Sequence, residues 1–539
     1  MRDADRSWWD EAADELVAAG IDQVFALPGD DMLALGALDA RGVGVVLAHS
    51  QRTAVHMALG YAATTRGVGV VVVGRGPGIA GALGAMLEAA TGSTPLVVLS
   101  GGAPLGEAHP QTFQYAPQLE LVRPLCRSAV RVETSGEVRA RVAQSLLVAA
   151  GPPAGVAYVE LPDPPQDDPP RAQVSEPAVA VTRPARAHDP GAVPPPPVLR
   201  EARRPVILAG GGCQALPRGA LTAWSQSWGA PVVCTASGRG VADEHSDLYL
   251  GVAGLYLHPE ARRVLADADV VVTLGTRLED TATIGLPVAP QTIQVNVEVA
   301  DFDVSRPGAL VQADVRSVVG HWARPDAVDA QWTSRVLAAG GALQAWAQER
   351  VATNPVAAVV SAAVAGLPPG STFCQENGLM DIWSYLFPVT RLPPEVDMIV
   401  PSEQTTLGFG CAAAVGARHA RRGDGGVVLV VTGDGAAATL GQDLDAPAPG
   451  ARGVVLVVLD NAGFGWLEAQ DRRVNGVHGR FVDIARPRLA SAAVAQVTIS
   501  PGDVATVRAA VAGVASGEIR VVRVPCSLED GPPVVDDVW

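Results

Sequence analysis

The sequence predicts an α/β fold made of three doubly wound parallel-sheet domains. Short apolar runs rich in valine recur along the chain, and many of them end in a glycine turn that leads into a helical segment. This alternation is typical of parallel sheets, whose strands are buried on both faces. At 539 residues the chain is too long for one hydrophobic core. Three blocks of similar size and style therefore indicate a repeated architecture.

The first block, residues 1–165, has clear secondary-structure signals. We expect strands at residues 24–27, 43–47 and 68–73, and a helix over residues 51–65 with Ser50 as its N-cap. Residues 166–198 are rich in proline and charge, so they are predicted to form a linker.

The second and third blocks repeat the pattern. Residues 199–330 are predicted to form a central domain, with strands near 205–209, 270–274 and 292–297. A weaker break near residues 323–332 precedes a third domain, for which we expect the limits 345–539. Its apolar runs at 427–431 and 454–459 are joined by a short crossover, which predicts two neighbouring parallel strands.

Composition limits the possible partners. The net charge of −16 argues against binding to nucleic acid or to an anionic membrane surface. No apolar run reaches the roughly 18 residues that a transmembrane helix needs. Six scattered cysteines show neither metal-ligand spacing nor disulfide density, so we expect a reducing cytoplasm. The chain has no lysine, which excludes Schiff-base and P-loop lysine chemistry.

A split motif near the C-terminal end carries the strongest chemical signal. Gly433-Asp434-Gly435 follows one apolar run, and Asp460-Asn461-Ala462-Gly463 follows the next. Asp434 and Asn461 are thus expected at the carboxyl ends of adjacent strands, where open α/β sheets bind ligands. Two oxygen donors beside a glycine-rich turn suit Mg²⁺ that bridges to a diphosphate. Alone, the first half would be read as an ordinary turn.

Together with motifs elsewhere, this pair resembles the thiamine-diphosphate enzymes of the acetolactate synthase and 2-oxo acid decarboxylase type. The resemblance covers nearly the whole chain: the first block resembles the pyrimidine-binding domain, the second the central domain and the third the diphosphate-binding domain. The motifs that carry it are Val24-Phe25 to Pro28-Gly29, Gly60-Tyr61-Ala62, Gly76-Pro77-Gly78, Gly210-Gly211-Gly212, Gly238-Arg239-Gly240, and the split motif with its family-like gap.

The resemblance implies a role for each matched residue. The metal ion, Mg²⁺, would be held by the side chains of Asp434 and Asn461 and the carbonyl of Gly463. Thiamine diphosphate would be bound by Pro28, Gly29, Gly76, Gly378, Thr405, Leu407, Gly433, Gly435, Ala436 and Phe464. Leu407 stands where the family places the apolar wedge that bends the cofactor, although plain core packing would explain a lone leucine equally well. Gln114 matches a glutamine that faces the reacting carbon, and a surface loop glutamine is the alternative.

The chain departs from the family at its usual catalytic glutamate. Counting back from Gly60, that position is Gln51. The family's glutamate exchanges a proton with the cofactor's pyrimidine ring, whereas an amide cannot act as an acid near neutral pH. Residues 45–65 contain no Asp or Glu. Nearby, only His49 and His56 could transfer protons at pH 7; we expect His56 to pack on its helix and leave His49 open as a catalytic candidate.

Other departures weaken the case for acetolactate synthesis in particular. Thr281 replaces an arginine, Asp471 an aromatic residue and Gly81 an asparagine of the acetolactate synthases, and residues 376–383 lack a diphosphate-facing histidine. FAD binding is therefore doubtful. Only His109 stands where simple pyruvate decarboxylases carry paired histidines.

The resemblance implies a thiamine-diphosphate-dependent carbon–carbon lyase or carboligase, acetolactate-synthase-like but atypical. It would act on a small-molecule 2-oxo acid or aldehyde through a ylide and an enamine, and activity could be specialised or slow. In this family the site lies between the domains of two subunits, so a homodimer or homotetramer is expected. The alternative is a non-catalytic paralogue that keeps the cofactor site and serves as a binding or assembly subunit.

Overall fold

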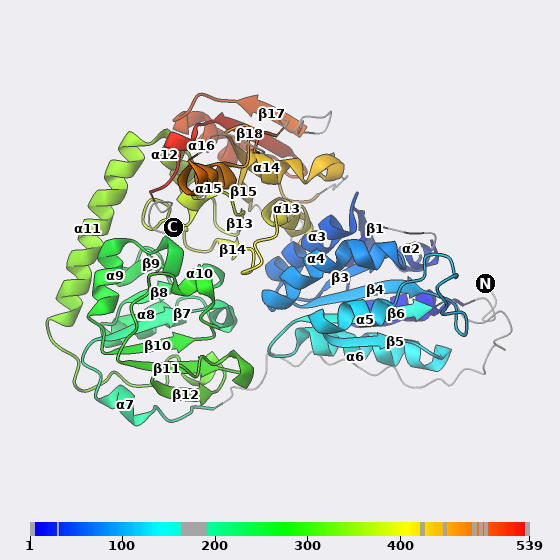
Figure 1. Cartoon of the computed structure of the whole chain (residues 1–539), viewed down its shortest axis with the longest axis horizontal. Coiled ribbons are helices and arrows are strands. Elements are labelled where there is room, and N and C mark those ends of the chain that lie inside the picture. Colours follow the sequence, from blue (N-terminus) through cyan, green and yellow to red (C-terminus); the bar gives the residue numbers. More distant parts are fainter. Residues whose placement is uncertain are drawn as a thin grey trace. The chain divides into compact units, whose positions relative to one another are not determined.

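The computed structural model confirms the predicted fold class: three six-stranded parallel sheets, each accompanied by helices (Figure 1). It describes residues 6–27, 29, 32–162, 191–420, 426–445, 450–476, 482–484, 489 and 494–533. Pro28 and residues 166–190 of the predicted linker lie outside these described residues. The chain divides into two compact units. Unit 1 comprises Met1–Arg186, Gln404–Gly423 and Leu440–Arg452, and unit 2 comprises Ala187–Glu403, Asp424–Thr439 and Gly453–Trp539.

Unit 1 contains the first sheet, in the order β2-β1-β3-β4-β6-β5. Its strands are β1 (Gln23–Leu27), β2 (Gly44–Leu47), β3 (Gly69–Val73), β4 (Leu96–Gly102), β5 (Cys126–Arg131) and β6 (Val156–Pro162). Its helices are α1 (Trp8–Ala18), α2 (Leu33–Asp39), α3 (Gln51–Thr65), α4 (Pro77–Thr91), α5 (Gln118–Val122), α6 (Val138–Ala150) and α13 (Phe409–Ala420), with the 3₁₀ turn η10 (Gly441–Asp445). The predicted helix over residues 51–65 and its Ser50 cap are confirmed, since Ser50 accepts a hydrogen bond from the Thr53 N–H.

Two glycines let helices α3 and α13 pack backbone to backbone. A Cβ atom added to Gly60 on α3 would lie 1.9 Å from the carbonyl oxygen of Ala413, and one added to Gly416 on α13 would lie 1.8 Å from that of Met57. No side chain fits at such distances. The contact therefore ties α13, which is remote in sequence, to the helix that begins at Gln51.

Unit 2 contains the other two sheets. The central sheet has the order β12-β11-β10-β7-β8-β9, and the third sheet the order β14-β13-β15-β16-β18-β17. The strands of the central sheet are β7 (Pro205–Ala209), β8 (Val232–Cys234), β9 (Tyr249–Val252), β10 (Val270–Leu274), β11 (Gln291–Asn296) and β12 (Gly308–Gln312). Those of the third are β13 (Thr372–Gln375), β14 (Asp397–Ile399), β15 (Val428–Gly433), β16 (Val454–Asp460), β17 (Val494–Thr498) and β18 (Ile519–Pro525).

The helices of unit 2 include one that joins its two cores. They are α7 (Pro197–Arg200), α8 (Ala220–Trp228), α9 (Pro259–Ala266), α10 (Asp280–Thr283), α11 (Trp332–Thr353), α12 (Pro355–Ala365), α14 (Asp434–Ala438), α15 (Gly465–Asn475) and α16 (Val504–Gly513). Trp332 near the start of α11 belongs to the core of the central sheet, and Ala347 near its end to the core of the third. Residue 345, the predicted start of the third domain, lies within α11. Among the described helices, none is long and apolar enough to cross a membrane.

Candidate functional site

The two halves of the split motif meet as predicted. Strands β15 and β16 pair in parallel, with Gly433 opposite Leu459, so Asp434 and Asp460 follow at the same level of neighbouring strands. Asn461 comes next, and Ala462 takes the left-handed backbone conformation (φ 61°) that turns the chain back at this edge. Asp434 and Asn461 therefore lie at the carboxyl edge of one sheet, where open α/β sheets place ligands.

Buried polar atoms without partners gather at this edge. Among the described residues, no hydrogen bond reaches Asp434 Oδ2, Asn461 Nδ2, or the buried Gln375 Oε1 and Asn377 Nδ2 near the end of β13. An amide flip would present the oxygen of Asn461 in place of its nitrogen. Buried polar groups normally have partners, so this concentration indicates a place for a bound polar group. The donor set of carboxylate and amide oxygens fits Mg²⁺, and the glycine-lined edge fits a diphosphate.

Phe464 and the glycines of this edge are in close contact. A Cβ atom on Gly435 would lie 2.8 Å from the Phe464 ring, and one on Gly465 would lie 2.9 Å from Asn461 Nδ2. The Gly435 N–H donates to Asp434 Oδ1 at 2.9 Å, so this amide already has a partner. The backbone of Gly463 forms an isolated antiparallel β-bridge with that of Asp483. Glycine is thus required where the aromatic ring and the amide approach the turn.

Asp381 is a buried acid at this edge that the sequence analysis did not single out. It lies in the 3₁₀ turn η9 (Met380–Ser384), is fully buried, and a Cβ atom on Gly378 would lie 2.9 Å from its Oδ2. Neither carboxylate oxygen receives a hydrogen bond of normal geometry from the described residues. Burial, followed by repulsion from Glu376, raises its pKa well above the usual range, although the nearby Gly433 N–H opposes this.

Asp460 is a second buried acid at this edge, part of the split motif but without a role assigned from the sequence. Arg523 on β18 donates to its Oδ2 at 2.7 Å, and both side chains are buried. Burial alone would raise the pKa of Asp460, but the hydrogen bond from Arg523 outweighs this effect and the pKa is lowered. Burial, and then the contact with Asp460, raises the pKa of Asp434 to about 6. We call Gly378, Asp381, Gly433, Asp434, Gly435, Ala436, Asn461, Gly463 and Phe464 the unit 2 cluster.

The other predicted residues lie in unit 1, where they follow the carboxyl ends of four parallel strands. Gly29 follows β1, His49 and Gln51 follow β2, Gly76 follows β3, and Gln114 lies in the loop after β4. Because parallel strands end at one edge, these residues share that edge. With Thr405 and Leu407, described below, we call them the unit 1 cluster.

Two close contacts fix the positions of Gln114 and Gln51 in the unit 1 cluster. Gly76 (φ 56°) lies against the backbone of Gln114, whose own φ is 53°, and a Cβ atom on Gly76 would be 2.1 Å from the Gln114 carbonyl oxygen. The side chain of Gln51 lies against Gly81 on α4, where a Cβ atom would be 2.7 Å from Oε1. Among the described residues, nothing hydrogen-bonds to the Gln51 amide. The absence of a side chain at residue 81 thus makes room for it.

The histidines of this region have different environments. His56 is buried with its ring edge on Phe409, and burial lowers its pKa to about 3, so it stays neutral and packs as expected. His49 is 60% exposed, and its backbone N–H and ring Nδ1 both lie within 2.8 Å of Asp443 Oδ1. Asp443 comes from η10, far along the chain, and nothing in the sequence pointed to it.

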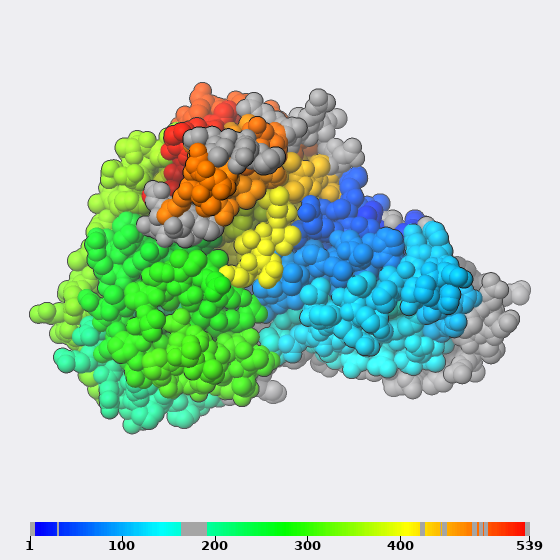
Figure 2. Space-filling view, in the orientation of Figure 1, coloured from blue at the N-terminus to red at the C-terminus, as the bar shows by residue number. Residues whose placement is uncertain are grey.

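Leu407 belongs to unit 1 and follows Thr406, which is held to Glu88 on α4. The N–H and hydroxyl of Thr406 both donate to Glu88 Oε2, at 3.1 and 2.6 Å, and Thr405 (φ 47°) and Gly408 (φ 85°) flank the turn. Glu88 lies seven residues beyond Gly81 on α4, or roughly 10 Å along the helix axis. Thr406, next to the half-exposed Leu407, therefore contacts a different turn of α4 from the one that Gln51 packs against. The yellow segment around it reaches the surface in Figure 2.

Three family models match the chain, one for each sheet. The N-terminal thiamine pyrophosphate binding domain matches residues 10–121, the central domain of thiamine pyrophosphate enzymes residues 197–321, and the C-terminal thiamine pyrophosphate binding domain residues 377–518. The chain belongs to the thiamine pyrophosphate enzyme family.

Curated relatives within this family share about a quarter of their residues with the chain. It is 26% identical to the acetolactate synthase large subunit of Parasynechococcus marenigrum, over 83% of the chain and 75% of that protein. It is 28% identical to the probable 2-ketoarginine decarboxylase of Pseudomonas aeruginosa, over 79% and 78%. The match to the acetolactate synthase large subunit of Lactococcus lactis, at 28%, spans about half of each, 55% and 52%.

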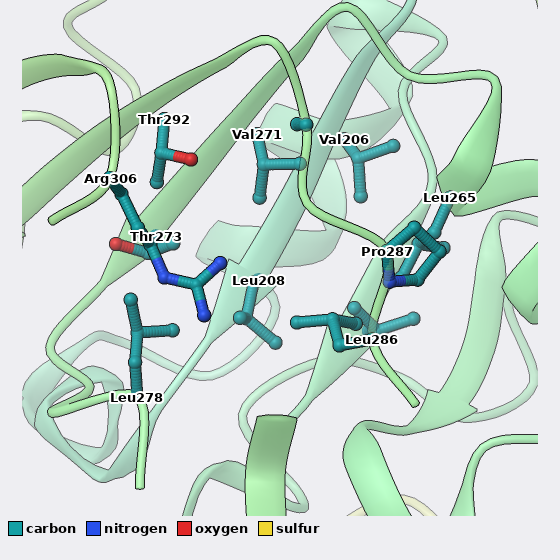
Figure 3. Close-up of a pocket in the computed structure, with 12 residues that line it drawn as sticks. Val206, Leu208, Leu265, Val271, Thr273, Leu278, Leu286, Pro287, Thr292 and Arg306 are labelled. Atoms are coloured by element: carbon teal, nitrogen blue, oxygen red, sulfur yellow. The ribbon is translucent and has the colours of Figure 1, made fainter. Parts of the chain in front are cut away.

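A cavity in the central domain of this thiamine pyrophosphate enzyme is too small for a ligand. It has a volume of about 10 Å³, room for a single water, between the face of the central sheet and the chain after β10 (Figure 3). Its lining is mostly aliphatic, with Leu208 and Val271 from the strands and Leu286 from the covering chain. It is a small packing gap.

Thr281 stands where the acetolactate synthases carry an arginine. Its N–H and its hydroxyl both donate hydrogen bonds to the Glu403 carboxylate.

Proposed function

We propose that this chain is a thiamine-diphosphate-dependent carbon–carbon lyase or carboligase that acts on a 2-oxo acid or an aldehyde. Membership of the thiamine pyrophosphate enzyme family supports the cofactor. The relatives named as acetolactate synthases and as a probable 2-ketoarginine decarboxylase support the reaction class. The observation that carries the proposal is the set of buried, unpartnered polar atoms of the unit 2 cluster.

In this proposal the unit 2 cluster holds the cofactor. Asp434, Asn461 and the Gly463 carbonyl would bind Mg²⁺. Gly433, where nothing lies within 4 Å of an added Cβ atom, would leave room for the diphosphate, while Asp381 lies against Gly378 and Phe464 packs on Gly435. Arg523 neutralises Asp460, so that Asp434 remains the acid committed to the metal ion. Bound thiamine diphosphate supplies the carbanion chemistry, and the protein supplies binding and orientation.

The unit 1 cluster would act on the reacting end. Gln51 would offer an amide hydrogen bond, and Gln114, whose backbone lies against Gly76, would face the substrate. Leu407 would be the apolar wedge. Since the turn that carries Leu407 and the side chain of Gln51 contact different turns of α4, we propose that a second copy of the chain completes the site in a homodimer or homotetramer. We also propose the domain limits 1–165, 199–330 and 345–539, and a reducing cytoplasm as the place of action.

The alternative function, a non-catalytic paralogue, is favoured by one observation: residues 45–65 contain no carboxylic acid. Such a protein would bind thiamine diphosphate without activating it. The two functions differ in whether the bound cofactor exchanges protons.

Exchange of the C2 proton of thiamine diphosphate decides between them. The purified protein with Mg²⁺ and cofactor in deuterated buffer is expected to exchange this proton faster than free cofactor does, measured by quenched-flow NMR. Asp434→Asn, which loses the metal-binding carboxylate, serves as the control and should return the rate to that of free cofactor. If the wild-type protein binds the cofactor and exchange is no faster, and if no 2-oxo acid is consumed, the enzyme proposal fails.

A further inference from the structure

His49 and Asp443 form a pair in unit 1 that no sequence motif signals. The Asp443 Oδ1 atom lies 2.7 Å from the backbone N of His49 and 2.8 Å from its ring Nδ1, although the residues are 394 positions apart. The Asp443 side chain is 3% exposed and that of His49 is 60% exposed. A buried carboxylate thus holds an imidazole that is open on its other side.

This geometry selects one form of the ring. A carboxylate oxygen accepts hydrogen bonds, so Nδ1 carries its hydrogen toward Asp443, and Nε2 is left as the nitrogen that can accept a proton. Among the described residues, Asp443 is the one charged group within ion-pair distance of the ring. The nearest cation along the chain is Arg52 in the first turn of α3, and the other histidine of this helix, His56, is buried and neutral.

The position of the pair links it to the missing acid. His49 lies two residues before Gln51, at the turn between β2 and the start of α3. Gln51 cannot exchange a proton near neutral pH, whereas an imidazole can. A carboxylate behind an imidazole fixes its orientation and stabilises its charged form, as in other acid–base pairs.

The geometry points to a specific assignment: His49 is the acid–base group of the unit 1 cluster, and Asp443 is the positioning residue that orients it. The assignment rests on the proposed function. In it, Nε2 takes one proton from the cofactor side and later returns it, Nδ1 keeps its hydrogen on Asp443, and the positive charge formed in between faces the Asp443 carboxylate. No proton is gained or lost over the cycle.

Conservative variants separate this role from a merely structural clamp between η10 and the β2–α3 turn. His49→Asn keeps a side-chain N–H that can reach Asp443 but cannot take up a proton. Asp443→Asn keeps an oxygen that accepts from the backbone N–H of His49 but cannot stabilise an imidazolium. His245→Asn, at an exposed histidine of unit 2, is the matched control.

The experiment measures C2 proton exchange of bound thiamine diphosphate between pH 5 and 9, with cofactor affinity and urea midpoint measured alongside. We expect the wild-type rate to rise through the range in which imidazole loses its proton. In His49→Asn and Asp443→Asn the rate should fall by about 10-fold or more and the step should disappear, while affinity and midpoint stay unchanged. The ¹⁵N shifts of the His49 ring in cofactor-free protein should report hydrogen on Nδ1, and this preference should weaken in Asp443→Asn.

The outcomes distinguish the two proposals. Faster exchange in the wild type, with unchanged rates and pH profiles in both variants, overturns the assignment and leaves the proposed function standing. Lower affinity or stability at an unchanged rate per bound cofactor shows that the pair is a clamp, and also overturns it. A wild type that binds the cofactor without accelerating exchange overturns the proposed function, and the assignment with it.

Discussion

The two polar clusters of this chain differ in how their side chains are satisfied. The unit 2 cluster carries buried acids and amides whose atoms lack partners, such as Asp381 and Asn461. In the unit 1 cluster the Gln51 amide lies half-exposed against Gly81, and His49 has a buried carboxylate partner. Unmet buried groups are costly unless a ligand fills the place, whereas exposed or paired groups cost little. The contrast supports the proposal that the unit 2 cluster holds the cofactor, since its buried groups lack partners among the described residues.

The largest expected effect is on cofactor binding and comes from a change in the unit 2 cluster. Asp434→Asn should weaken binding of thiamine diphosphate with Mg²⁺ by at least about 100-fold, because it removes the charged side chain that we propose as a metal ligand. Calorimetric titration measures this. Asp247→Asn, at an exposed aspartate of the central domain, should bind like the wild type. Equal affinities of Asp434→Asn and the wild type would show that Asp434 is not a metal ligand.

The next effect tests the helix contact beneath Gln51. Gly60→Ala should lower the free energy of unfolding by about 3 kcal/mol, since its methyl group would lie 1.9 Å from the Ala413 carbonyl oxygen and the helices must separate. Urea titration measures the change. Gly84→Ala on α4 is the control, because nothing lies within 4 Å of the added methyl, and it should be neutral or stabilising by up to about 1 kcal/mol. A Gly60→Ala protein as stable as Gly84→Ala would contradict the close packing.

A third change adds to the unit 1 cluster the charge it lacks. Gln51→Glu should raise the rate of C2 proton exchange by about 10- to 100-fold and leave cofactor affinity nearly unchanged, because a carboxylic acid can move a proton where an amide cannot. The quenched exchange assay and a binding titration give the two values. Gln51→Met, which cannot donate a hydrogen bond, is the companion variant and should not raise the rate. A lower rate in Gln51→Glu would show that the glutamine is adapted to its task.

The smallest effect concerns the buried acid of the unit 2 cluster. The pKa of Asp381 is raised on folding, so the cofactor-free folded protein holds this proton more tightly than the unfolded chain does. Asp381 therefore lowers stability progressively as the pH rises from about 4, the unfolded value, toward its higher folded pKa. Asp381→Asn should remove this loss and be more stable than the wild type at pH 8 by about 1–2 kcal/mol, with a smaller difference near pH 4.

Urea midpoints of both proteins at pH 4, 6 and 8, without cofactor, test this dependence on pH. Asp247→Asn, whose carboxylate is exposed, should show the wild-type profile. An Asp381→Asn protein whose midpoint follows the wild type at every pH would show that Asp381 is not held in a low-dielectric environment.

Local sequence determined the strands, the turns and the residues that follow the strand ends. The alternation of valine runs and glycine turns is a short-range signal, so the helix at Gln51 and the pairing that brings Asp434 next to Asp460 could be predicted. Glycines at positions such as 76 and 435 mark places where the backbone must approach another group, and this too is encoded locally.

Only the tertiary structure decided which distant groups meet. Asp443 reaches His49 across 394 residues, Arg523 reaches Asp460 from another strand, and Glu88 holds the turn before Leu407. Asp381 stands out in sequence as one acid in an apolar segment, yet its burial depends on the whole third sheet. Charge and hydrogen bonding act through space, so partners far apart in the chain leave no periodic trace in it. Residue type and strand order thus determined where a site could lie, and long-range packing determined which of its groups are paired and which have no partner among the described residues.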